Sequence, residues 1–180
     1  MNGDYTKPFP VSVIGKEKID LSDDKQKLAV TEAQTLGRLL AAEGFLVLTG
    51  GLGGIMEAVS KGVCEAGGIS IGFVPILSEE EKQARRVSRF QTCQINTGMD
   101  QRVRIPLLIN SCQAVIIISG GTGAWLEVMF AVANNVPVLS LFKTGGTAEK
   151  IVSEGQFQEE VTPCESVEMV LTLIKALRGN

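Results

Sequence analysis

Two glycine-rich turns of the same design lie about seventy positions apart in this sequence. The first is VLTGGLG at residues 47–53 and the second is IISGGTG at residues 117–123, and both continue an apolar stretch typical of a strand. A glutamate, Glu57 or Glu127, follows seven residues after the first glycine of each turn. Where a strand turns into a helix in this way, the backbone N–H groups of the helix N-terminus favour an anion without any lysine. The sequence therefore predicts two segments suited to a nucleotide phosphate.

Glycine also serves tight turns and close helix–strand packing, so one such turn is weak evidence for binding. Two copies at two predicted strand-to-helix junctions favour binding more strongly. Met56 suits a core position as well as a ligand contact, because methionine fills irregular gaps. We expect a phosphate-bearing small molecule to contact both turns, through Gly50, Gly51, Gly53, Gly54, Met56, Ser119, Gly120, Gly121, Thr122, Gly123 and Ala124.

The chain contains no histidine, which excludes several kinds of catalytic site. Serine–histidine triads, cysteine–histidine pairs and histidine-based metal sites cannot form. The four cysteines show no CxxC pair and are expected to be reduced, mostly buried thiols rather than metal ligands. We therefore expect no metal site and no resident cofactor, and any acid–base chemistry must use carboxylates, lysine, tyrosine, thiols, water or groups of the substrate.

Strand and helix patterns alternate along the chain, with glycines at the ends of the strands. The pattern predicts strands at residues 10–15, 45–49, 69–74, 114–118 and 137–141, and helices at 25–43, 53–66, 100–110 and 122–134. Thr162–Glu165 reads as a capping box that opens a last helix ending near Leu177. The expected fold is α/β, a single-domain, three-layer, Rossmann-like, doubly wound parallel sheet over residues 1–180, with ligands beyond the carboxyl ends of the strands.

Charge and hydropathy limit the partners that we expect. The formal charge is −3, and the only basic cluster is Arg85, Arg86 and Arg89, so nucleic acid is not an expected partner. That cluster falls in the charged stretch 78–89, which is expected to be a surface loop or a short helix. No apolar run approaches the roughly 20 residues of a membrane span, and no signal peptide is evident. These features predict a cytoplasmic protein that does not bind membranes.

Several segments together resemble a known superfamily. SGGTGAWLE at residues 119–127 resembles the PGGxGTxxE signature of the Lonely Guy (LOG), or lysine decarboxylase-like, phosphoribohydrolases. TGGLGGIMEAVSKGVCEAGGISIGFVP at 49–75 is similar to the first glycine segment of that Rossmann superfamily. The stretch from Thr97-Gly-Met to AVII at 114–117 is similar to the branch that contains the molybdenum-cofactor carrier proteins. The likeness covers about residues 11–141.

The resemblance implies two catalytic residues and a homo-oligomer. In the hydrolases an arginine precedes the signature glutamate and shares its site. Arg104 has the corresponding spacing from Glu127, with Arg102 as the nearby alternative. The family also implies a homodimer or higher homo-oligomer, with the helix that bears Arg104 near the two-fold partner. Without such a role, Glu127 would be a helix-capping carboxylate and Arg104 a surface salt-bridge partner.

Three departures from the signature count against hydrolysis. Ser119 replaces the signature proline, Ala124 replaces its threonine, and Ile105 stands where the hydrolases usually have a lysine. Loss of the threonine hydroxyl removes one hydrogen bond to a charged phosphate, worth roughly 1.5–3 kcal/mol.

Two functions follow. The first is cleavage of the N-glycosidic bond of a nucleoside 5′-monophosphate, in which Glu127 stabilises an oxocarbenium-like transition state. With a reference pKa of about 4.3, Glu127 is expected to be ionised unless deeply buried, so it suits a stabiliser or general base better than an acid. No residue is evident as the acid for the departing base. The alternative is a non-catalytic binding or carrier protein for a nucleotide or the molybdenum cofactor.

Overall fold

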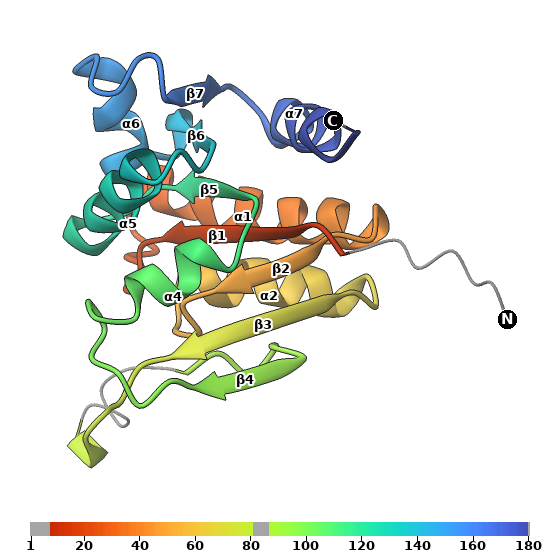
Figure 1. Ribbon diagram of the computed structural model, residues 1–180, viewed down its shortest axis with the longest axis vertical. Helices are drawn as coiled ribbons and strands as arrows, with labels where there is room; N and C mark the ends of the chain where they lie inside the picture. The colour runs from red at the N-terminus through yellow and green to blue at the C-terminus, as the bar shows by residue number, and fades with distance from the viewer. Residues whose placement is uncertain (1–7, 81–86, 180) are drawn as a thin grey trace, which may run out of the picture.

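The protein is built around one parallel β-sheet. The computed structural model describes residues 8–80 and 87–179, and within them it forms a seven-stranded sheet in the order β4-β3-β2-β1-β5-β6-β7 (Figure 1). All neighbouring strands pair in parallel. The strands are β1 Pro10–Gly15, β2 Leu46–Thr49, β3 Ile69–Val74, β4 Cys93–Asn96, β5 Ala114–Ile118, β6 Val138–Leu141 and β7 Val161–Cys164.

Helices cover both faces of the sheet. On one face, α1 (Asp24–Ala42), α2 (Ile55–Glu65) and α7 (Val167–Gly179) share a buried apolar cluster with the sheet. On the other face, a second cluster joins the sheet to helices α4 (Ile105–Asn110), α5 (Thr122–Ala133) and α6 (Gly146–Ser153). A short 3₁₀ helix, Phe142–Thr144, precedes α6. The predicted three-layer, doubly wound α/β fold is therefore confirmed.

The strand β5 shows why the sequence folds this way. All five of its residues are buried, as expected for a parallel strand covered on both faces. Ala114, Ile116 and Ile118 enter the cluster with α1, α2 and α7, whereas Val115 and Ile117 enter the cluster with α4, α5 and α6. Side chains that alternate between the two faces of β5 thus contribute to both apolar clusters.

The direction of strand addition reverses at β1. It pairs with β2 on one side and with β5 on the other, so the chain winds outward from this strand in both directions. At such a switch point the loops after the two strands separate and leave a crevice at the carboxyl edge of the sheet. This crevice lies between the segments after Gly15 and after Ile118.

The end of the chain differs from the prediction. Residues 161–164 form strand β7 and pair with β6, and α7 begins only at Val167. The capping-box pattern of Thr162–Glu165 is therefore wrong as a helix start. Pro163 fits because β7 is the last strand of the sheet, and an edge strand tolerates a residue without an N–H.

Other elements were shorter than predicted or were not predicted. Within the expected helix 100–110, only Ile105–Asn110 is α-helical, with Pro106 in its first turn, where proline is tolerated. Neither β4 nor α6 was predicted. Residues 81–86, which include Arg85 and Arg86 of the basic cluster, lie outside the described residues.

Candidate functional site

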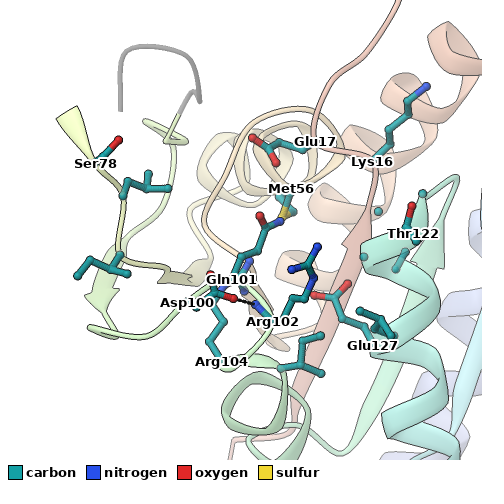
Figure 2. Close-up of a pocket in the computed structure, with 18 residues that line it drawn as sticks. Lys16, Glu17, Met56, Ser78, Asp100, Gln101, Arg102, Arg104, Thr122 and Glu127 are labelled. Atoms are coloured by element: carbon teal, nitrogen blue, oxygen red, sulfur yellow. Dashed lines mark hydrogen bonds between the residues drawn. The ribbon is translucent and has the colours of Figure 1, made fainter. Parts of the chain in front are cut away.

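The crevice at the switch point is a pocket of about 800 Å³ (Figure 2). Four chain segments line it: residues 15–17 after β1, 76–78 after β3, 100–105 before and into α4, and 121–127 at the start of α5. Met56 from α2 completes the wall. The pocket therefore lies beyond the carboxyl ends of the strands, where doubly wound sheets bind ligands.

The second glycine turn opens directly onto this pocket. Gly121 is the N-cap of α5 in an extended conformation, and no side chain caps this helix. A Cβ added at Gly121 or Gly123 would meet nothing within 4 Å. The first backbone bond of the helix runs from the Trp125 N–H to the Gly121 carbonyl, so the amides of residues 122–124 precede the helical ladder. This terminus can receive an anion.

Ser119 and Gly120 lie behind the turn and outside the residues that line the pocket. Both have positive φ angles, 56° and 107°. Their carbonyls accept the N–H groups of Ala148 (2.8 Å) and Thr147 (3.2 Å) at the start of α6. The Ser119 N–H donates to Thr144 Oγ1 at 2.8 Å. These contacts fix the position of the turn, and both residues lie behind the pocket lining.

The first glycine turn is filled by the protein itself. The Ile55 N–H at the start of α2 donates to the Lys16 carbonyl at 2.9 Å. A Cβ on Gly54, which has a φ of 66°, would fall 2.2 Å from that carbonyl oxygen. Gly53 and Gly54 instead line a second pocket of about 730 Å³ on the α1–α2 side. The two turns therefore do not face one common pocket.

The other two glycines of the first turn, Gly50 and Gly51, pack closely against residues from other elements. A Cβ on Gly51 would fall 2.7 Å from a Val74 methyl, so this glycine packs against β3. Gly50 lies against the guanidinium of Arg104 and the sulfur of Met56. Arg104 is only 2% exposed and precedes α4 as its N-cap, and its backbone N–H donates to the Asp100 carbonyl at 3.1 Å. Gly50 thus leaves room for a buried cation in the pocket wall.

Glu127 points from α5 into the pocket, on the side where the arginines lie (Figure 2). Its side chain is only partly exposed, and burial raises the pKa of this carboxyl to about 7, against the opposing effect of the positive charge of Arg104. The sequence predicted an ionised glutamate unless the side chain was deeply buried, and here burial favours the protonated form. Its pKa therefore lies near neutral pH, well above the ordinary value for a glutamate.

Sequence reasoning missed several residues that line the pocket. Lys16 and Glu17 follow β1, and Asp100 and Gln101 precede Arg104. The signal that could have found the first two is topological, since the loop after the innermost strand borders the switch point in this fold. No motif marks the other two.

Comparisons with known proteins agree with the fold. The model of the SLOG cluster4 family matches residues 8–171, so the chain belongs to that family. The crystal structure of the protein TM1055 has a TM-score of 0.81 and 28% identity, covering 93% of this chain and 99% of that one. The molybdenum cofactor binding protein from Rippkaea orientalis has a TM-score of 0.74 and 27% identity, covering 95% and 98%. A Moco carrier protein from Chlamydomonas reinhardtii has a TM-score of 0.77 and 27% identity, covering 96% and 99%. The predicted place in the LOG-like superfamily, near the carrier branch, is confirmed.

Proposed function

We propose that this SLOG cluster4 protein binds a small molecule through a phosphate group held at the N-terminus of α5. The observation that carries the proposal is the uncapped start of α5, open at Gly121 and Gly123, within a pocket of about 800 Å³. Pockets for small molecules usually measure about 300–1,000 Å³, so this one can hold a nucleotide or a pterin. The buried cation of Arg104 adds to the positive potential of the helix end.

We favour a binding or carrier role, with a molybdenum-cofactor type of ligand. The neighbours from Rippkaea orientalis and Chlamydomonas reinhardtii are named as a molybdenum cofactor binding protein and a Moco carrier protein. Ala124 supports this role, because it lines the pocket without the hydroxyl that the hydrolase signature places there. The ligand is cargo in this proposal, gripped by backbone amides and released unchanged.

The second candidate is hydrolysis of a nucleoside 5′-monophosphate. The electrostatic interaction of Arg104 with Glu127 in one pocket favours it, because the hydrolase signature combines an arginine with this glutamate. A carboxyl with a pKa near 7 could donate a proton to the departing base, the role for which the sequence offered no residue. The same carboxyl cannot then also be the permanent anion that stabilises the transition state.

Two measurements separate the candidates. The protein is incubated with AMP, and adenine release is followed by chromatography. In parallel, retention of the molybdenum cofactor through gel filtration is followed by pterin fluorescence and molybdenum content. The carrier proposal predicts retention of cofactor and no adenine. Sustained adenine release that Glu127→Gln abolishes, with AMP binding at pH 6.5 retained, would establish the hydrolase instead.

We also propose a homodimer formed through α5 and the segment before α4. Val103, Leu126 and Met129 are large apolar side chains that are 63%, 40% and 51% exposed on these two elements. Leu126 also lines the pocket, so a second copy on this face would border the ligand site. Sedimentation velocity should show a dimer that Met129→Asp converts to monomer, whereas Met169→Asp on α7 should leave it intact.

A further inference from the structure

The Glu127 side chain and the open amides at the start of α5 face the same pocket. Residue 127 follows residue 123 by one helical turn, and side chains in a helix lean toward its N-terminus. The Glu127 carboxyl therefore points toward the place where an anion would lie against residues 122–124. An ionised carboxylate there repels the ligand that the helix terminus attracts.

The other charges around the pocket do not remove this conflict. The lining contains three basic and three acidic side chains, namely Lys16, Arg102, Arg104, Glu17, Asp100 and Glu127. From α6, which packs beside α5, Glu149 is tied to Lys25 at 2.8 Å and does not line the pocket. With all six lining groups charged, the formal charges cancel. Removal of one negative charge would add a net positive side-chain charge to the attraction that the helix terminus supplies.

We infer that Glu127 takes up a proton when the anionic ligand binds, so that protein, proton and ligand form one complex and Glu127 selects for the charge of the ligand. This inference rests on the proposed anion site at α5. The proton enters from solvent and resides on the Glu127 carboxyl, and no covalent bond of the ligand changes. Release of the ligand returns the proton.

The electrostatics of the empty site support this inference. Burial already raises the pKa of Glu127 to about 7, with Arg104 acting in the opposite direction. A bound dianion raises it further, because like charge disfavours the ionised form. Since binding raises the pKa, affinity is greatest below pH 7 and falls as the pH rises above it. The fall approaches tenfold per pH unit while the pKa in the complex stays above the pH.

Calorimetric titration with AMP at pH 6.5 and 8.5 tests this linkage. Because phosphate monoesters lose their second proton near pH 6, AMP is mostly a dianion across this range. Inorganic sulfate, measured by competition, provides an anion that does not titrate. We expect the affinity of the wild type for both anions to fall about tenfold or more. At pH 7, buffers of different ionisation enthalpy should show net proton uptake for each AMP bound.

Two variants complete the test. Glu127→Gln should bind AMP with little dependence on pH and without proton uptake. Glu17→Gln removes another carboxylate from the same pocket and serves as the matched control, which should keep the pH slope of the wild type. Proton uptake by the unaltered protein tests the inference even if Glu127→Gln folds poorly. An equal pH slope in wild type and Glu127→Gln, or AMP binding by the wild type without proton uptake, would overturn the inference alone, whereas no anion binding at any pH would overturn the proposed function as well.

Discussion

The guanidinium of Arg104 lies directly against the backbone of Gly50. A Cβ placed on Gly50 would fall 2.7 Å and 2.9 Å from the two terminal nitrogens of Arg104, and 2.9 Å from the sulfur of Met56. The first glycine turn therefore contributes to the pocket indirectly, because Gly50 leaves room for the buried guanidinium of Arg104. We propose that Gly50, which the sequence suggests as a phosphate contact, supports Arg104.

We predict that Gly50→Ala weakens anion binding by displacing Arg104. The new methyl requires the guanidinium to shift, and a cation so buried has little room to move. AMP affinity at pH 6.5 should fall about tenfold, which corresponds to about 1.4 kcal/mol. Gly179→Ala, at the end of α7 and outside the pocket lining, gains a methyl that meets nothing within 4 Å, so it is the control and should bind as the wild type does. Unchanged affinity in Gly50→Ala would contradict the supporting role.

We predict that Gly121→Asp caps α5 and abolishes ligand binding. Gly121 is an N-cap without a side-chain hydrogen bond, and aspartate is among the best residues at that position. The aspartate carboxylate would accept hydrogen bonds from the first backbone N–H groups of α5. This would add about 1 kcal/mol of stability relative to alanine at the same position. The melting temperature should therefore rise above that of Gly121→Ala while AMP binding disappears. If Gly121→Asp still binds AMP tightly, the anion lies elsewhere.

We predict that Gly54→Ala is strongly destabilising. Its φ of 66° disfavours any side chain, and the added Cβ would lie 2.2 Å and 2.3 Å from the carbonyl oxygens of Lys16 and Glu17. We expect a loss of about 3 kcal/mol or more in urea unfolding, because both strain and overlap contribute. Gly67→Ala has a similar positive φ but open space around it, so its cost should stay near 1 kcal/mol. Equal costs in the two variants would show that the Lys16 loop yields freely.

We predict that Glu127 makes the folded protein less stable as the pH rises. Between the ordinary pKa of 4.5 and the folded value of about 7, the native state keeps a proton that the unfolded chain releases. This contribution to stability therefore falls as the pH rises through that range, and above pH 7 the full cost remains. Glu127→Gln should melt roughly 2–4 °C above the wild type at pH 8, which corresponds to about 1 kcal/mol after allowance for partial exposure. At pH 4.5 the gap should close, and a gap independent of pH would contradict the assignment.

The sequence predicted best what local pattern decides. Strand β5 is a run of apolar residues, and the glycines after it leave the chain few alternatives to a turn into α5. The strand β4, with the sequence CQIN, has all four residues exposed and carries no apolar run, so no local signal marks it. The pairing of β7 with β6 overrides the helix-capping pattern of Thr162–Glu165, because the backbone pairing with β6 holds these residues in an extended conformation.

The candidate site likewise has one part that a local motif predicts and one part that depends on distant segments. Residues 121–124 and Glu127 belong to one helix and follow from one motif. The first glycine turn, by contrast, is closed by the carbonyl of Lys16, which lies in the loop after β1, far earlier in the chain. The pKa of Glu127 depends on burial by neighbouring elements and on the charge of Arg104, neither of which a spacing rule contains. Contacts between distant segments thus decided which glycine turn stays open.

The place of β1 in the sheet has a consequence for how the protein is made on the ribosome. Val11 pairs with Ala114, so β1 gains its second neighbour only after more than half of the chain has been synthesised. At that point α1, α2 and α4 have been synthesised, but α5 and α6, which complete the cluster that contains Ile14, Leu48 and Phe73, have not. The growing polypeptide therefore exposes apolar side chains on one face of the sheet during translation. Chaperones recognise such a surface, and it favours aggregation of chains stalled before β5.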